Sequence, residues 1–420
     1  MDVEYLIIGA GISGLTFANY CDDDYLIVEK ENEIGGYCRT IKRNNFVWDY
    51  AGHFFHFNTD EIKKLFLENI SKDKIIYNKK CSKILYKNQL IDFPFQLNIH
   101  QLEKAEFIDC LYDLFNKKEK DKYDNFLDML YGKFGKSIVE KFLKPYNEKL
   151  YATDLNLLDI DAMGRFFPYA NKEQIIANMK ENEFNSYNQE FLYPVEGAAS
   201  FINILANKLD KNKILLNTEI IEVNTGKKTV SLNNGQTISY RYLINTSPLS
   251  QFLNLVGGYD DLIRDMSYNK VLVYNIGFNK KSENFVDEHW LYVPSSDINF
   301  YRVGFYSNIL SQEKLSIYVE IGYDRDHVID DKEIKLQFDN TIDNLLKANI
   351  INSNMLVEDY AALVLDPGYV HINTNTNKKI DLVKQELSKT SIFTIGRYGA
   401  WTYNSMEDSM LAAKDLAEKI

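Results

Sequence analysis

The chain has 420 residues, 45% of them hydrophobic, which is enough for two or three packed units with substantial cores. Its net charge of −12 excludes a protein that binds nucleic acid through a basic surface, because phosphate contacts need positive charge. No apolar stretch reaches the roughly 18 residues of a membrane span.

The first thirty residues predict a strand, a helix and a second strand. Tyr5–Gly9 is a short apolar run and reads as a buried strand, and Gly14–Tyr20 reads as the helix that follows. Tyr25–Glu29, with the sequence YLIVE, reads as a second buried strand. Two buried strands joined by a helix form the βαβ unit from which parallel sheets are built.

The turn between the first strand and the helix has the sequence GAGISG. In this GxGxxG pattern Gly9 makes the tight turn, Gly11 lets the backbone approach a pyrophosphate, and Gly14 lets helix and strand pack closely. The helix that follows Ser13 presents its positive end to that pyrophosphate, and Ser13 is a further candidate cofactor ligand. Glu29 ends the second strand, where a carboxylate can hold ribose hydroxyls. A glycine-rich structural turn would leave Glu29 unexplained, so we predict a dinucleotide site.

The middle of the first half of the chain has helical periodicity. Apolar residues recur at helical spacing over Glu61–Ile70 and over Lys104–Leu150, where Gly132 and Gly135 interrupt the pattern. The second of these stretches predicts a helical insertion.

The second half of the chain changes to strand periodicity. Ile214–Ser239 alternates around the step Asn234-Gly235, which is typical of a hairpin turn. A last helix is expected over Ser409–Ile420. Further strands are predicted over Leu243–Asn245, Val271–Phe278, Trp290–Val293, Phe300–Ser307, Leu315–Gly322 and Ser391–Ile395.

A second glycine pair follows the ribose carboxylate, in the sequence EIGGYCRT. Gly35, Gly36 and Arg39 in this segment resemble the motif of the FAD-binding fold shared by amine oxidases, protoporphyrinogen oxidase, desaturases and UDP-galactopyranose mutase. In that fold a C-terminal segment returns to the flavin. The residues here that look like that segment are Gly396, Arg397, Asp408, Ser409 and Met410. The resemblance therefore implies FAD rather than a nicotinamide cofactor.

Residues 49–56, with the sequence DYAGHFFH, are similar to the glycine-histidine segment of the UDP-galactopyranose mutase family. In that family the first histidine, here His53, lies close to the flavin. His53 and His56 could instead be a zinc pair or two core histidines. A zinc site is disfavoured because no cysteine or carboxylate cluster supplies further ligands, and we predict no metal.

Further segments resemble the same family over nearly the whole chain, from Phe93–Gln96 onward. The resemblance implies diphosphate binding by Arg302, for which a surface salt bridge is the alternative, and by Arg165. Arg165 departs from the family pattern, in which the arginine falls at the position of Phe166. The resemblance also implies substrate contacts for Tyr146, Asn147, Tyr151, Tyr193, Trp290, Tyr292, Tyr301, Tyr369 and Tyr403.

The resemblance implies a nucleotide-sugar mutase, an isomerase of polysaccharide biosynthesis that interconverts pyranose and furanose forms, with UDP-galactose as the default substrate. The reaction would pass through a covalent sugar adduct of reduced FAD, with His53, Arg302 and Arg165 as catalytic groups and NAD(P)H as a possible reductant. The implied fold is α/β, with a Rossmann-like FAD domain, a helical insertion and an antiparallel-sheet substrate domain. The expected domains are a discontinuous FAD-binding domain of residues 1–95, 190–255 and 375–420, a helical substrate domain of residues 96–189, and a sheet domain of residues 256–374.

Two other classes of protein use related motifs. A flavin oxidase of the amine oxidase or protoporphyrinogen oxidase type is the main alternative, and a flavin-free escort protein is disfavoured by the intact glycines. The four cysteines form no CxxC pair, and the acidic start of the sequence is unlike an export signal, so we expect reduced thiols in the cytoplasm. The sugar and the nucleotide stay open, and a homodimer is possible.

Overall fold

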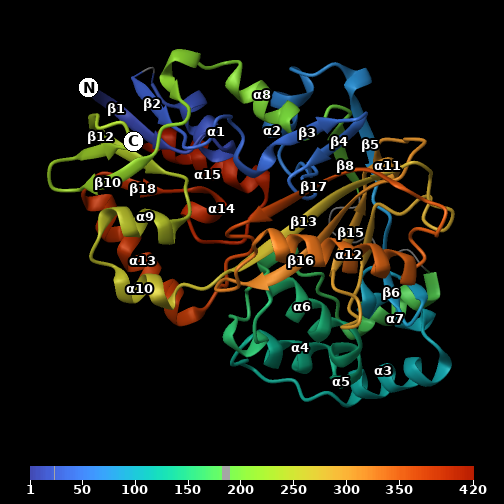
Figure 1. Cartoon of the computed structure of the whole chain (residues 1–420). Coiled ribbons are helices and arrows are strands. Elements are labelled where there is room, and N and C mark those ends of the chain that lie inside the picture. The colour runs from blue at the N-terminus through green and yellow to red at the C-terminus, as the bar shows by residue number, and fades with distance from the viewer. Residues whose placement is uncertain (23, 182–189) are drawn as a thin grey trace.

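The computed structural model describes residues 1–22, 24–181 and 190–420. Within them the chain forms two seven-stranded sheets, two short two-stranded sheets, and helices that cover both large sheets. Figure 1 shows the first sheet beside both chain ends, the second sheet in the middle, and a group of helices on its far side. The last part of the predicted helical insertion, residues 182–189, lies outside the described residues.

The first sheet contains the predicted βαβ unit. Strands β1 (Asp2–Ile8) and β2 (Tyr25–Val28) pair in parallel, and helix α1 (Ile12–Tyr20) connects them. The sheet order is β10-β11-β12-β1-β2-β9, with β18 beside β12. The predicted hairpin is present between β11 and β12. The remaining strands of this sheet are β9 (Ile214–Leu215), β10 (Ile220–Asn224), β11 (Thr229–Leu232), β12 (Thr237–Asn245) and β18 (Ile392–Thr394).

The second sheet has the order β17-β13-β16-β15-β14-β6-β7 and is antiparallel except where β14 pairs with β6 in parallel. Strands β6 and β7 come from the part of the chain assigned by sequence to the FAD unit, and they pair within this second sheet. Its strands are β6 (Ser82–Tyr86), β7 (Gln89–Asp92), β13 (Asn269–Phe278), β14 (Trp290–Tyr292), β15 (Arg302–Phe305), β16 (Ser316–Asp324) and β17 (Val357–Leu365).

Strand periodicity divides the second sheet into an apolar face and a cavity face. Leu291, Val303 and Val319 point into an apolar core that helix α12 (Asp331–Lys347) covers. Their neighbours along the strands point the other way, because successive side chains in a strand alternate. Trp290 and Arg302 are among these neighbours and line a cavity. The predicted strand over Phe300–Ser307 ends earlier, since a short helix, α11 (Tyr306–Ile309), begins there.

The helical insertion is broken into several pieces. The unpredicted break over residues 117–125 separates α3 (Lys104–Asn116) from α4 (Phe126–Phe134). A second break falls at Gly135, where φ is +76° and a Cβ would lie 2.5 Å from the Asp113 carbonyl oxygen, so a side chain is excluded. The later pieces are α5 (Lys136–Ile138), a π-helical turn (Val139–Leu143), α6 (Lys144–Tyr151) and α7 (Lys172–Glu181).

The C-terminal segment returns to the first sheet, as Figure 1 shows. Strand β18 adds to β12, and α15 (Met406–Lys419) packs against α1. None of the helices in the described part of the chain is long and apolar enough to cross a membrane. The other elements are α2 (Asp60–Leu67), α8 (Ala199–Ala206), α9 (Leu249–Val256), α10 (Asp260–Asp265), α13 (Thr374–Lys389), α14 (Gly396–Gly399), β3 (Thr40–Arg43), β4 (Phe46–Asp49), β5 (Ile75–Lys79) and β8 (Glu190–Pro194).

Candidate active site

A cavity of about 950 Å³ runs from the glycine loop of the first sheet to the cavity face of the second. Its walls come from both large sheets, from α6, from the segment after β4 and from the C-terminal segment. Most of the sequence-predicted cofactor and substrate residues therefore lie around one space, although they are spread over some 400 positions of the chain. A cavity of this size is in the range of ligand and cofactor sites.

The glycine loop has the geometry expected of a dinucleotide site. A Cβ on Gly14 would lie 2.0 Å from the carbonyl oxygen of Gly9, so α1 can approach the loop only with glycine there. Glu29 is 7% exposed, and its carboxylate accepts hydrogen bonds from the backbone amides of Ala10 (2.7 Å) and Glu31 (3.0 Å). The carboxylate is thus held at the cavity, where a ribose would meet it.

The second glycine pair lies directly beside this loop. The amide of Gly35 donates to the carbonyl of Ala10 at 2.8 Å. Arg39 donates from Nε to the Gly36 carbonyl (2.8 Å), and its guanidinium lies 4.6 Å from the centre of the Tyr50 ring. Both glycine motifs and Arg39 therefore line the cavity together, as predicted for an extended cofactor.

The C-terminal segment meets the glycine loop from the other side. A Cβ on Gly396 would lie 2.4 Å from Oγ of Ser13, so these two residues are in direct contact. Arg397 donates to the carbonyl of Asn404 at 2.9 Å and lies over the Tyr403 ring at 4.4 Å. Ser409 also lines the cavity. The two ends of the chain thus build one site.

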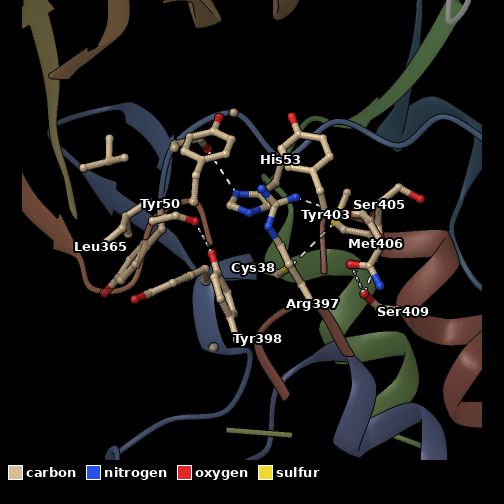
Figure 2. A pocket seen from close by; sticks show the side chains of 18 of the residues that line it. Cys38, Tyr50, His53, Leu365, Arg397, Tyr398, Tyr403, Ser405, Met406 and Ser409 are labelled. Carbon is tan, nitrogen blue, oxygen red and sulfur yellow. Dashed lines mark hydrogen bonds between the residues drawn. The ribbon is translucent and has the colours of Figure 1, made fainter. Parts of the chain in front are cut away.

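His53 lines the cavity close to Arg397, as Figure 2 shows. Burial lowers the pKa of His53 to about 4, and the positive charges of Arg397 and Arg302 lower it as well. Burial likewise lowers the pKa of His56 to about 4, and Nδ1 of that ring lies 2.9 Å from the Glu190 carbonyl. Both rings are therefore neutral near pH 7 and act as hydrogen-bonding groups rather than as cations.

Hydrogen bonds fix the histidine segment at both of its ends. At its start, buried Asp49 accepts hydrogen bonds from Thr40 Oγ1 (2.6 Å) and from the Tyr193 hydroxyl (2.7 Å). At its end, buried Glu407 at the start of α15 accepts from the backbone amides and side chains of Asn58 and Thr59 at 2.7–3.0 Å. Glu407 belongs to the C-terminal segment indicated by the sequence, but its hydrogen bonds could not be predicted, since its partners lie about 350 positions away.

Arg302 lies on the cavity face of the second sheet. Its guanidinium donates from Nε and Nη2 to the two carboxylate oxygens of Glu320, at 2.9 and 2.7 Å, and Nη2 also donates to the Tyr369 hydroxyl at 3.3 Å. Glu320 is 1% exposed, so this is a buried pair and not the surface salt bridge considered from sequence. The pair projects a planar donor group into the cavity.

Aromatic side chains surround Arg302. The rings of Tyr369 and Tyr403 are stacked with 5.8 Å between their centres, and the Tyr146 ring meets the Tyr292 ring edge-on at 5.5 Å. Such a wall suits sugar and nucleobase faces. Of the predicted substrate residues, the ones that line the cavity are Tyr146, Asn147, Trp290, Tyr292, Tyr301, Arg302, Tyr369 and Tyr403.

Arg165 does not lie where a phosphate ligand was predicted. Its guanidinium pairs with Asp408 and stacks on Phe166 at 4.9 Å, and neither Arg165 nor Asp408 lines the cavity. Asp408 also caps α15 through Ser405 in a capping box. Both groups therefore join the loop before α7 to the C-terminal helix, away from the cavity wall at which the phosphate and cofactor roles were predicted.

Three more predicted site residues lie in the core. Met410 is 0% exposed and packs in the apolar cluster under α1. The Tyr193 hydroxyl is used by Asp49, and the Tyr151 hydroxyl faces the Ala162 carbonyl at 3.4 Å. None of the three side chains lines the cavity, because each is covered by its neighbours.

Comparisons with known proteins agree with this geometry. Residues 12–364 match the family of flavin containing amine oxidoreductases. The chain belongs to this family. The flavoprotein's fold is that of reduced UDP-galactopyranose mutase, whose structure matches with a TM-score of 0.92 and 23% identity over 100% of this chain and 93% of that one.

Other proteins that this chain resembles have other activities. Cyclohexylamine oxidase from Brevibacterium oxydans matches with a TM-score of 0.68 and 13% identity, over 100% of this chain and 98% of that one. A ferredoxin–NADP reductase from Malacoplasma penetrans is 25% identical over 251 residues, which are 56% of this chain and 70% of the relative. The predicted FAD-binding fold and the FAD cofactor are confirmed by the family and by this fold.

Proposed function

We propose that this flavoprotein is a nucleotide-sugar mutase that interconverts pyranose and furanose forms of a nucleoside-diphosphate hexose, with UDP-galactose as the first substrate to test. The observation that carries the proposal is Arg302, a buried planar donor among tyrosines in the same cavity as the dinucleotide loop. A guanidinium matches the oxygens of a diphosphate. Full-length likeness to a mutase structure supports the proposal at the level of the fold.

Each wall of the cavity has a part in the proposed reaction. The glycine loop, Glu29 and Arg39 would hold FAD, which in its reduced form would supply a nucleophile with no net change in redox state. Arg302 holds the leaving diphosphate, which lowers the barrier by stabilising the charge that develops on it. Tyr292 and Tyr146 provide faces for the sugar and base, and the neutral His53 ring offers a hydrogen bond without a competing charge. Catalysis would thus rest on positioning and electrostatics.

An amine oxidase is the alternative function, because the family includes flavin-containing amine oxidoreductases. Its substrate is an amine, which is protonated near neutral pH. Arg397, a positive side chain of the cavity with no ion-pair partner in the described part of the chain, would repel such a substrate and attract an anion. The charge of the cavity therefore favours the nucleotide sugar.

The test is a turnover assay under anaerobic conditions. Dithionite-reduced enzyme is incubated with a panel of UDP- and dTDP-sugars, and chromatography resolves pyranose from furanose products. We expect conversion by reduced enzyme and none by oxidised enzyme. A parallel assay in air with NAD(P)H as reductant should show no stoichiometric consumption of NAD(P)H or oxygen with product. Oxygen consumption with a panel of amines, and no sugar conversion, would assign the oxidase instead.

A further inference from the structure

Lys80 is a cavity residue that sequence reasoning did not single out. It lies between β5 and β6, where the backbone is fixed against the start of β14. The amides of His289 and Trp290 donate to the carbonyl of Cys81 at 2.8 and 3.3 Å, and the Cys81 amide donates to Nδ1 of His289 at 3.1 Å. These contacts hold the Lys80 side chain at the cavity wall, which it lines.

The Lys80 ammonium lies beside aromatic rings and not beside hydrogen-bond acceptors. Its Nζ lies 5.3 Å from the centre of the Phe93 ring and 5.6 Å from that of Trp290. No hydrogen bond or ion pair joins it to any group in the described part of the chain. Lys149, by contrast, donates to backbone carbonyls such as those of Val293 and Ser295. A desolvated cation without an acceptor is unfavourable unless a ligand supplies one.

The charges on this wall indicate which kind of ligand would bind there. Arg302 is already balanced by the carboxylate of Glu320. Lys80 is therefore the positive charge on this side of the cavity that no carboxylate neutralises. Burial lowers the pKa of Lys80 to about 8, and the charge of Arg302 lowers it too, so the ammonium is still protonated at pH 7. A diphosphate carries at least two negative charges, more than the Arg302–Glu320 pair can balance.

Lys80 and Arg302 line the same cavity. Trp290 pairs with Ser82, and Tyr292 pairs with Arg302. Lys80 stands two positions before Ser82, in the short connection between β5 and β6, and its side chain lines the cavity beside Trp290. The Phe93 ring, which lies under the ammonium, also contacts the Tyr292 ring, with 4.7 Å between their centres. Aromatic rings thus form a continuous floor between Lys80 and Arg302.

We propose that Lys80 is the second cationic ligand of the substrate diphosphate, acting together with Arg302 across this aromatic floor. The assignment rests on the proposed function and deepens it, since it supplies the second phosphate ligand that Arg165 does not provide. It also explains why Lys80 is held beside apolar rings without an acceptor of its own. The ligand class is a nucleoside diphosphate, free or linked to a sugar.

The test measures binding of UDP and of uridine to the oxidised FAD-loaded enzyme by titration calorimetry. Replacing Lys80 with glutamine should raise the Kd for UDP about 10- to 150-fold, the range expected for a lost charged hydrogen bond, and leave the Kd for uridine within about threefold. Lys80→Met keeps the contact with the rings and should behave like Lys80→Gln. Lys79→Gln, at an exposed neighbouring position, is the matched control and should bind UDP normally.

Each other outcome overturns the assignment. If wild-type enzyme binds no UDP, the proposed function fails and this inference fails with it. If wild-type enzyme binds UDP and the Lys80 variants bind it equally well, only this inference fails. Equal weakening of UDP and uridine would show that Lys80 merely supports the aromatic floor. Slower flavin reduction by NADPH with an unchanged Kd for UDP would assign Lys80 to a phosphate of the reductant instead.

Discussion

Arg302→Ala should reduce both the stability of the protein and its affinity for UDP, for two separable reasons. The substitution removes the guanidinium that holds both carboxylate oxygens of Glu320, which is 1% exposed. Breaking one side of a buried ion pair costs about 3–5 kcal/mol, because a buried charge is left without its partner. The same substitution removes a donor to the diphosphate, worth about 1.5–3 kcal/mol, or roughly 10- to 150-fold in Kd.

The double variant Arg302→Ala/Glu320→Ala separates the two effects. It removes the orphaned carboxylate, so most of the lost stability should return, while the affinity for UDP should stay low. The orphaned carboxyl of the single variant can also escape its charge by taking up a proton, so that variant should lose less stability at pH 5 than at pH 8.

Urea unfolding of the FAD-loaded proteins, followed by flavin fluorescence, measures the first effect, and calorimetry with UDP measures the second. The single variant should unfold at a urea concentration lower by about 1 M or somewhat more. Recovery of UDP affinity in the double variant would refute the role of Arg302 as a diphosphate ligand. Wild-type stability in the single variant would refute the importance of the buried pair.

Three further outcomes are expected. Acid precipitation should release FAD into the supernatant, since the predicted cofactor is bound without a covalent link; flavin retained by the pellet would contradict this. Gly14→Ala should abolish FAD content, because its Cβ would lie 2.0 Å from the Gly9 carbonyl oxygen, whereas Gly226→Ala, with no atom nearer than 3.7 Å, should retain it. Burial lowers the pKa of His289 and His371 to about 4, so the unfolded state binds more protons between pH 6.5 and 4. The melting temperature should therefore fall as pH falls through that window, less steeply in His→Asn variants.

Local features of the chain could be predicted from sequence with good accuracy. The glycine loop, α1 and the carboxylate of Glu29 lie within thirty residues, and their backbone contacts are set by residue type and spacing. The apolar runs around Leu26 and Val303 likewise predict strands. A continuous apolar run fits a strand buried on both faces, and an alternating run fits a strand buried on one face. FAD binding followed from these short-range patterns together with the second glycine pair at Gly35.

The composition of the substrate wall was decided only by tertiary structure. Arg302 and Glu320 meet through antiparallel pairing of β15 with β16, and Lys80, just before β6, reaches the same cavity because β6 pairs with β14 across some 200 positions. Arg165 was expected in the cavity from a family resemblance, yet it is tied to Asp408 more than 240 positions away. Whether a charged side chain binds a ligand or a neighbouring residue depends on which opposite charges lie within reach. That depends on how distant segments pair, and residue types and spacing along the chain do not specify those distances.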